Sequence, residues 1–400
     1  MTVSTYRDVI VIGAGAAGLM CAAVAGQRGK RVMLIDHASV LAEKIRISGG
    51  GRCNFTNLLT GPQNFLSENP HFCRSALTRF TPKDFLTLMK RYQIAYHEKH
   101  KGQLFCDVSA EQVIRMLEAE CEKGAVDLRM PCKVQKITKT AEHFQVQTDQ
   151  GLVIANAVVI ATGGLSIPKI GASDFAFRIA RQFSIPVVEP RPALVPLTFD
   201  AAHWQPFVPL AGISLEVDIE TGEKKQRGCF REDLLFTHRG LSGPAVLQIS
   251  SYWQEGKEIR INLLPDVELA DRLIQEKSAS RKNLANVLAG YLPHRLAEEW
   301  LKRGQYPAEM RVADIQDKTL RALGDSINHW TITPNGTEGY KKAEVTRGGI
   351  DTKALSQQTM MVKEVPNLYF VGEATDVTGW LGGYNFQWAW ASGFVAGQSL

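Results

Sequence analysis

The first candidate for chemistry is a glycine-rich turn near the start of the chain, Gly13-Ala14-Gly15-Ala16-Ala17-Gly18. It follows an apolar run, Val9 to Ile12, that predicts a buried strand, and it opens an alanine-rich run, Ala16 to Gly29, that predicts a helix. Glycines in this GxGxxG spacing permit a tight turn, close approach of the backbone to a pyrophosphate, and close packing of helix on strand. The helix N-terminus then favours phosphate. We predict a dinucleotide site with contacts at Gly13, Gly15, Ala16, Ala17 and Gly18.

An acid ends the next predicted strand, Arg31 to Ile35. Asp36 is placed to accept hydrogen bonds from ribose hydroxyls, and its charge disfavours a 2′-phosphate, so NADP is not expected here. A glycine turn kept only for packing is the alternative. The acid at this spacing favours the dinucleotide.

A second glycine-rich segment, KIRISGGGRCNFTN, runs from Lys44 to Asn57. Consecutive glycines bring backbone amides to a ligand, two basic residues can neutralise phosphate, and the Ser and Asn side chains can bond to a ribityl chain or a flavin edge. A purely structural loop is the alternative, but long loops between core elements are usually functional. The predicted cofactor contacts are Lys44, Ser48, Gly49, Gly50, Gly51, Arg52, Cys53 and Asn54.

A third constellation lies near the end of the chain, where Gly372 to Asp376 and Gly379 to Phe386 precede a predicted helix, Gln387 to Leu400. Asp376 suits a ribityl or pyrophosphate contact. Backbone amides at the helix start are expected to face the flavin N1 and O2 edge and stabilise the charge of reduced flavin. The predicted contacts here are Gly383, Tyr384, Asn385 and Phe386, and a docking helix with a tryptophan core is compatible with them.

These motifs need a sheet to position them. A buried strand, Ala157 to Ala161, is predicted to end at the contacts Thr162 and Gly163, and a late strand, Leu368 to Val371, is expected to complete the sheet begun at Val9. Helices are predicted at Pro82 to Arg91 and at Ser109 to Lys123 from their N-terminal signals. Shorter strands are predicted at Val126 to Arg129, Val134 to Thr138, His143 to Thr148 and Leu152 to Ile154.

Prolines crowd together from Pro186 to Pro196 and mark an inserted region. The predicted fold is α/β, a Rossmann-like FAD-binding domain with a parallel sheet and helices, interrupted by an insert. We expect residues 1–190 and 343–400 to form the FAD-binding domain, residues 191–265 a β-rich insert, and residues 266–342 a helical insert whose clearest helical stretch is Leu284 to Leu301.

Composition bounds the remaining choices. The chain is 44% hydrophobic and 22% charged, as in globular proteins, and its net charge of +5 is spread out, with the densest basic run at Lys224, Lys225 and Arg227. On that basis we expect no nucleic-acid partner. Seven cysteines without a CxxC pair predict free thiols in a reducing compartment, and no apolar stretch reaches the roughly 20 residues of a membrane span, so a cytoplasmic protein is expected.

Other residues that could take part in chemistry give weaker support for a functional role. His97 and His100 lack further ligands nearby, so no metal is expected. His238 and Arg239 are equally compatible with a loop that caps the flavin and with a simple turn. The absence of a CxxC pair disfavours a disulfide-reductase mechanism, and the absence of a second GxGxxG means that any NAD(P)H would bind transiently.

Taken together, these places resemble the BaiN/YhiN-like family of FAD-dependent oxidoreductases, bacterial flavoproteins of the glutathione-reductase-like superfamily. The resemblance spans nearly the whole chain and rests on SGGGRCNFTN at 48–57, VIATGGLS at 159–166, LLFTHRGLSGPAVLQIS at 234–250, TPNGTEGY at 333–340 and DVTGWLGGYNFQWAWAS at 376–392. It implies FAD contacts at the motifs above and at Val134. The loop after Asp36 departs from the basic run that is usual in the family.

The expected function is that of an FAD-dependent oxidoreductase moving a hydride or electron pair between flavin and an unidentified small molecule held between the FAD domain and the insert. NAD(P)H is a candidate donor. One alternative is an amine oxidase that uses oxygen, and another is an FAD-binding module for sensing or RNA modification. No catalytic side chain, substrate or oligomeric state follows from the sequence.

Overall fold

The computed structural model describes residues 5–224 and 227–400. Contacts divide the chain into two units, Met1–Arg191 with Val345–Leu400, and Pro192–Glu344. The chain therefore leaves the first unit once and returns to it once. Two strands that pair with each other, β11 (Val187–Ala193) and β19 (Val345–Ile350), lie at these two crossings.

The main sheet of the first unit is centred on β1 (Thr5–Ile12), whose last four residues are buried. Parallel partners lie on both sides, with β2 (Val32–Ile35) on one and β10 (Gly151–Ile160) on the other. The late strand β20 (Leu368–Phe370) runs parallel to the end of β10, with Leu368 opposite Val158. The prediction that a late strand completes the first sheet is confirmed.

The edges of this sheet differ in direction. On the β2 side, β7 (Asp127–Arg129) adds a further parallel strand. On the other side, the first half of β10 pairs antiparallel with β9 (Phe144–Thr148), which pairs with β8 (Val134–Lys139). The predicted break between Leu152 to Ile154 and Ala157 to Ala161 is wrong, because β10 is one strand that changes partner along its length.

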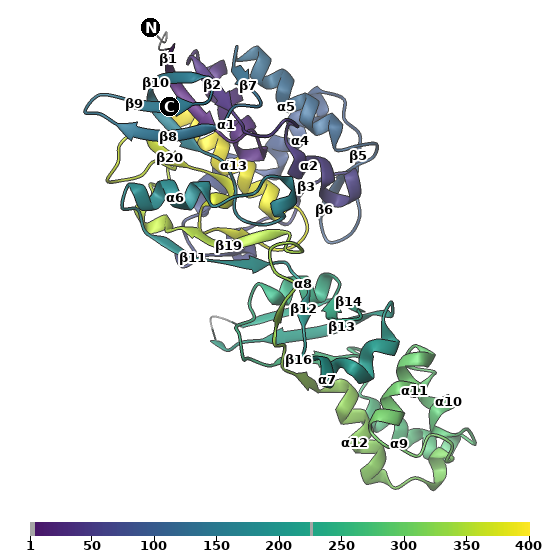
Figure 1. Ribbon diagram of the computed structural model, residues 1–400. Helices are drawn as coiled ribbons and strands as arrows, with labels where there is room; N and C mark the ends of the chain where they lie inside the picture. The colour runs from purple at the N-terminus through teal and green to yellow at the C-terminus, as the bar shows by residue number, and fades with distance from the viewer. Residues whose placement is uncertain (1–4, 225–226) are drawn as a thin grey trace. The chain divides into compact units, whose positions relative to one another are not determined.

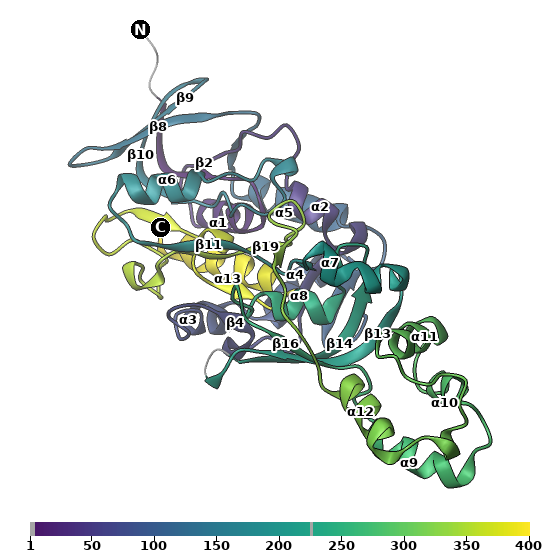
Figure 2. The ribbon, with the colours of Figure 1, turned by 60° about the horizontal axis from the view of Figure 1, so that its bottom comes forward.

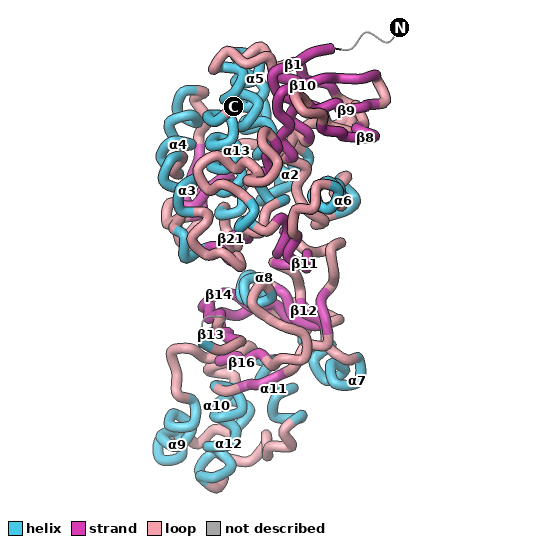
Figure 3. Tube along the Cα trace, turned by 90° about the vertical axis from the view of Figure 1, so that its left-hand side faces the viewer, coloured by secondary structure: helices cyan, strands magenta, loops and turns pink. Residues whose placement is uncertain are grey.

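Three helices form the buried layer against this sheet. Helix α1 (Ala16–Gln27) is buried along most of its length and packs on both α5 (Glu111–Lys123) and α13 (Tyr384–Ser399). A side chain at Gly393 would overlap the backbone of Ala17, so the glycine lets α13 cross α1 closely. In Figure 1 the two ends of the chain, purple and yellow, lie together here, and the strands and helices of the layer separate clearly in Figure 3.

A small three-stranded sheet stands beside the main one, in the order β3 (Asn54–Asn57), β6 (Gln103–Cys106) and β5 (Tyr96–Glu98). Helix α4 (Pro82–Arg91) begins as predicted, since the Thr81 hydroxyl accepts from the Asp84 amide. The remaining elements of this unit are α2 (Glu43–Ile47), β4 (Phe65–Leu66), α3 (Arg74–Arg79), α6 (Phe175–Gln182) and β21 (Thr378–Gly379).

The second unit contains an antiparallel sheet and a group of helices, as the fold class predicts. Its strand order is β17-β16-β13-β14-β15-β12-β18, and helix α8 (Pro244–Ser250) packs on β13 and β14. Figure 2 shows α9 to α12 grouped beyond the strands. The bounds are β12 (Leu197–Thr198), α7 (Ala201–Trp204), β13 (Ser214–Thr221), β14 (Gly228–Phe236), β15 (Gly240–Ser242), β16 (Ile259–Asn262), α9 (Leu269–Ala279), α10 (Leu284–Leu288), α11 (His294–Arg303), α12 (Asp317–Asn328), β17 (Trp330–Ile332) and β18 (Gly336–Thr337).

Two helix predictions need correction. The run from Leu284 to Leu301 is two helices, α10 and α11, because Pro293 starts a new helix after a turn. Ser109 does not form a capping box with Gln112; its hydroxyl accepts from the Glu111 amide and α5 begins there. All seven cysteines are free, as predicted. Among the described residues no helix is long and apolar enough to cross a membrane.

Candidate functional site

The glycine turn between β1 and α1 combines tight packing with one open position. A Cβ on Gly13 would lie 2.5 Å from the carbonyl oxygen of Ala161, and a Cβ on Gly18 would overlap the carbonyl of Gly13. Gly15, the N-cap of α1, has no protein atom within 4 Å of its Cβ position and makes no side-chain cap. The N-terminus of α1, with Ala16 and Ala17 in its first turn, therefore opens onto free space, as a phosphate site requires.

Asp36 follows β2 directly and orders the same turn. Its carboxylate accepts hydrogen bonds from the Ala14 amide at 2.7 Å and from the Ala38 amide at 2.9 Å. Its backbone oxygen accepts from the Cys132 amide at 2.7 Å, which ties the start of β8, and hence Val134, to the end of β2. Asp36 is 17% exposed, so the carboxylate also faces solvent, where a ribose hydroxyl can reach it.

The residues after β10 join this group. The amide nitrogen of Thr162 lies 2.8 Å from the Cβ position of Gly13, and Gly163 has a positive φ of 72° with open space beside it. The hydroxyl of Thr162 is buried without a hydrogen-bond partner among the described residues. An unpaired buried hydroxyl next to an open glycine turn fits a site that a polar ligand completes.

The segment Ser48–Gly51 forms a 3₁₀ turn in which Gly49 and Gly50 adopt left-handed conformations. Gly49 packs against the ring of Phe105, whereas the Cβ positions of Gly50 and Gly51 are open. Cys53 is fully buried, and burial raises the pKa of its thiol far above the ordinary value. Ser48 donates its hydroxyl to the carbonyl of Ile45 at 2.7 Å, and Arg52 is exposed.

The C-terminal turn meets this segment on strand β3. The Asn57 side chain donates to the carbonyl of Gly382 at 3.0 Å. The side-chain oxygen of Asn54 accepts from the Gly383 amide at 3.3 Å in the amide orientation that satisfies both of its ends. Asn385 turns back to the amide and carbonyl of Gly379, at 2.8 and 2.9 Å. The second and third motifs thus lie together, and the first turn of α13, with Tyr384 and Phe386, begins at their junction.

Asp376 is buried. Its carboxylate accepts from the Glu68 amide at 2.7 Å and from the Ser67 hydroxyl at 3.3 Å. Burial raises its pKa, and those hydrogen bonds act against that rise. The contacts show Asp376 anchoring the loop after β4, and its role toward FAD stays a prediction.

Lys44 has an acidic partner that sequence reasoning missed. Its ammonium lies 2.5 Å from the carboxylate of Glu373 and 2.7 Å from the hydroxyl of Ser166. Glu373 also accepts from the Ser166 hydroxyl and the Thr346 amide, both at 2.9 Å. The sequence does contain a signal for this partner. Glu373 follows an apolar strand and a glycine, and Asp36 likewise follows the apolar strand β2. Lys44 is therefore already paired with a carboxylate. A phosphate at its predicted contact would share the positive charge of Lys44 with Glu373.

Together these residues fit a dinucleotide that extends from the β2 edge toward α13. Open glycines stand at Gly15, at Gly50 and Gly51, and at Gly163, each where backbone can approach a ligand. Asp36 supplies the ribose acceptor at one end. The cofactor contacts themselves remain predictions, while the clustering of the turns is a property of the fold.

The sequence matches the family model described as "HI0933-like protein Rossmann domain" over residues 7–399. The chain belongs to this family. It is 51% identical over 394 residues to "Ribosomal RNA dihydrouridine synthase" of Escherichia coli (strain K12), with 98% of each chain covered. It is 46% identical over 402 residues to the protein of the same name from Haemophilus influenzae, with 99% of each covered. It is 29% identical over 416 residues to "3-dehydro-bile acid delta(4,6)-reductase" of Clostridium scindens, covering 97% of this chain and 98% of that protein.

The family membership agrees with the resemblance drawn from the motifs, and the cofactor of this chain is FAD. The chain is a flavin-dependent enzyme. The prediction of a small-molecule substrate with no nucleic-acid partner is wrong, because the relatives at 51% and 46% identity are named for ribosomal RNA. That prediction depended on net charge averaged along the chain, and an average does not register a local concentration of charge.

Proposed function

We propose that this enzyme reduces uridine to dihydrouridine in ribosomal RNA. The observation that carries the proposal is the 51% identity to a ribosomal RNA dihydrouridine synthase over 98% of both chains. The match covers 98% of this chain, a span that includes all three glycine-rich motifs. The more distant bile-acid relative supports the same class of reaction, because both names describe adding hydrogen to a carbon–carbon double bond.

The reaction adds a hydride to one carbon of the uracil C5–C6 double bond and a proton to the other. When bound, reduced FAD would supply the hydride, and a nicotinamide is the proposed source of the electrons that restore it. The chain's own residues supply position and electrostatics. The N-terminus of α1 and the open Gly15 suit the pyrophosphate, and Asp36 suits a ribose.

The first turn of α13 has a second role in this proposal. Its amides lie at the positive end of a 16-residue helix, next to Asn54 and Thr56 of β3, the strand that follows the Ser48–Gly51 turn. Such a group stabilises negative charge on the pyrimidine edge of a reduced flavin.

The test is anaerobic mixing of the reduced holoenzyme with ribosomal RNA that lacks modifications. We expect the visible absorbance of oxidised flavin to return at a rate that rises with RNA concentration. An unsaturated 3-keto bile acid is the comparison substrate. Reoxidation by the bile acid alone, with none by RNA, would overturn the proposal.

A further inference from the structure

The positive charge of this chain is concentrated in one segment of the first unit. Residues 74–101 hold seven Lys and Arg against two Asp and Glu, a net charge of +5, whereas the other 372 residues hold 39 of each sign. All seven basic side chains are exposed. They are Arg74, Arg79, Lys83, Lys90, Arg91, Lys99 and Lys101. We call the surface formed by α4 and the β5–β6 hairpin the basic face; it carries Lys83, Lys90, Arg91, Lys99 and Lys101, whereas Arg74 and Arg79 lie on α3.

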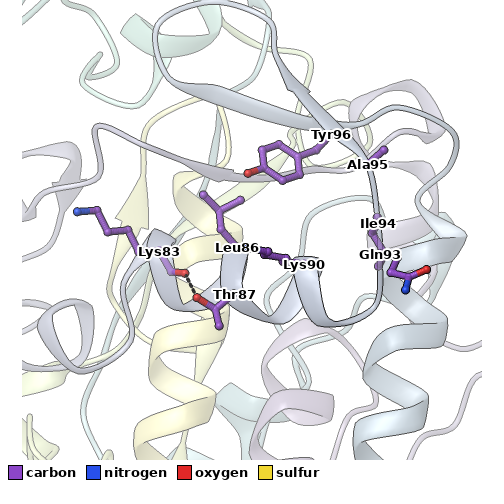
Figure 4. A pocket seen from close by; sticks show the side chains of 8 residues that line it. All are labelled: Lys83, Leu86, Thr87, Lys90, Gln93, Ile94, Ala95 and Tyr96. Atoms are coloured by element: carbon purple, nitrogen blue, oxygen red, sulfur yellow. Dashed lines mark hydrogen bonds between the residues drawn. The ribbon is translucent and has the colours of Figure 1, made fainter.

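The basic face includes a depression of about 690 Å³ between α4 and the segment 93–96. Lys83 and Lys90 stand seven residues apart on α4, and so on one side of the helix and about 10 Å apart along its axis. Neither forms an ion pair with any residue that the structure describes. Figure 4 shows Tyr96 extending over α4 next to Leu86, with both lysines on the helix.

Tyr96 gives this depression an aromatic surface. The side chain is 40% exposed, and its ring meets the buried ring of Phe55 edge-on, with centroids 5.8 Å apart. The ring is therefore held in place while much of it faces solvent. Unpaired lysines beside a fixed, exposed aromatic ring are the usual elements of single-stranded nucleic-acid sites, where bases stack and phosphates are neutralised.

The basic face shares a sheet with the flavin loop. Strand β5 pairs with β6, where His97 stands opposite Phe105, and β6 pairs with β3, where Phe105 stands opposite Asn54. Two strand spacings, about 10 Å, separate the edge strand from Asn54. Asn54 in turn contacts Gly383 at the start of α13. A strand of RNA bound along β5 therefore has neighbouring nucleotides within reach of the flavin site, and a base leaving the stack can enter it.

Arg91 of the basic face pairs with Glu120, and several basic residues on the sheet of the second unit are paired as well. Arg231 bonds to Glu216 and to Asp266, and Glu220 pairs with both Arg227 and Arg260. These charges are neutralised within the protein. On the basic face, His97 is held by Asp107 at 2.7 Å, and no group of three metal-binding side chains occurs among the described residues, so a metal does not explain the charge.

From these observations we propose that the basic face docks the single-stranded region of ribosomal RNA that carries the target uridine. The inference rests on the proposed function and adds the surface that recognises the substrate.

The test uses the holoenzyme and a ribosomal RNA fragment that the wild-type enzyme modifies. The double variant Lys83→Gln/Lys90→Gln removes two exposed charges from the basic face, and Lys282→Gln/Lys318→Gln removes two exposed charges from the second unit as the matched control. We expect the first to weaken RNA binding about tenfold or more. Its slope of log K against log salt should fall by about 1.4–1.8, while the control keeps the wild-type slope.

A third variant, Tyr96→Ala, should weaken RNA binding about tenfold with little change in salt slope, because it removes stacking rather than charge. All variants are checked for wild-type FAD absorbance. Wild-type affinity and slope in the Lys83→Gln/Lys90→Gln enzyme would overturn the inference while leaving the proposed function intact. If the Lys83→Gln/Lys90→Gln enzyme failed to modify ribosomal particles but still modified naked RNA, the inference would also be overturned. That result would point to a protein partner for the basic face. Failure of the wild-type enzyme to bind any ribosomal RNA would overturn both.

Discussion

Replacing Gly15 by alanine separates the cofactor role of the glycine turn from its structural role. Gly15 has φ −85° and ψ −167°, an extended conformation that any residue adopts, and a Cβ there meets no protein atom within 4 Å. The methyl group therefore fits the protein without FAD. Restricting the unfolded chain should even stabilise the apoprotein by about 0.4–1 kcal/mol.

The same methyl group occupies the space through which a pyrophosphate approaches the turn. Overpacking by one carbon costs about 1–3 kcal/mol, which corresponds to a roughly 5- to 150-fold rise in the Kd for FAD. The assay is titration of apoprotein with FAD, together with urea unfolding of the apoprotein. Gly18→Ala is the control, because its Cβ would overlap the carbonyl of Gly13 and should destabilise the apoprotein itself.

Two results would refute this reasoning. One is a Gly15→Ala protein that binds FAD with the wild-type Kd, which would show that the pyrophosphate does not lie against the turn at Gly15. The other is a Gly15→Ala apoprotein as unstable as Gly18→Ala, which would mean that the open space beside Gly15 is filled by the protein.

Further predictions concern charged groups. Asp36→Ala should lower both FAD affinity and apoprotein stability, since the carboxylate orders Ala14; unchanged flavin occupancy would contradict its role. Lys44→Met and Glu373→Gln should show a coupling free energy of at least about 1 kcal/mol in a double-mutant cycle. Strictly additive effects on stability would mean that the two side chains do not interact. For Glu120, burial opposes ionisation, but hydrogen bonds from Lys123 and other donors lower its pKa from 4.5 to about 2. Its contribution to stability is therefore complete above about pH 4.5 and is lost as pH falls toward 2, so Glu120→Gln should flatten acid unfolding curves in that range.

The sequence anticipated the features that depend on local pattern. An apolar run ending at Asp36, glycines at fixed spacing, and the apolar run at Leu368 predict a strand, a turn and a returning strand, because burial on both faces of a parallel sheet requires such runs. That a late strand completes the first sheet follows from that burial, and the structure shows that its partner is β10. The sequence did not predict the length of β10, because the point at which this strand changes partner has no signature in the hydrophobicity pattern.

Features that depend on tertiary contact could not be read from the sequence. Nothing local shows that Asp376 turns to the amide of Glu68, or that Lys44 finds Glu373 more than 300 residues away. The basic face is a similar case. Its five cations, from Lys83 to Lys101, are spread over 19 residues with acids and apolar residues between them. Only the folding of α4 against the β5–β6 hairpin gathers Lys83, Lys90 and Tyr96 around one depression.

The most direct test of the central claim is nucleoside mass analysis of unmodified ribosomal RNA after incubation with the purified holoenzyme and NADH or NADPH. We predict that one or a few uridines gain the mass of two hydrogen atoms, that the gain requires the nicotinamide, and that the Gly15→Ala enzyme produces much less at limiting FAD. Ribosomal RNA that stays unmodified while the same enzyme preparation remains loaded with reducible FAD would contradict the account.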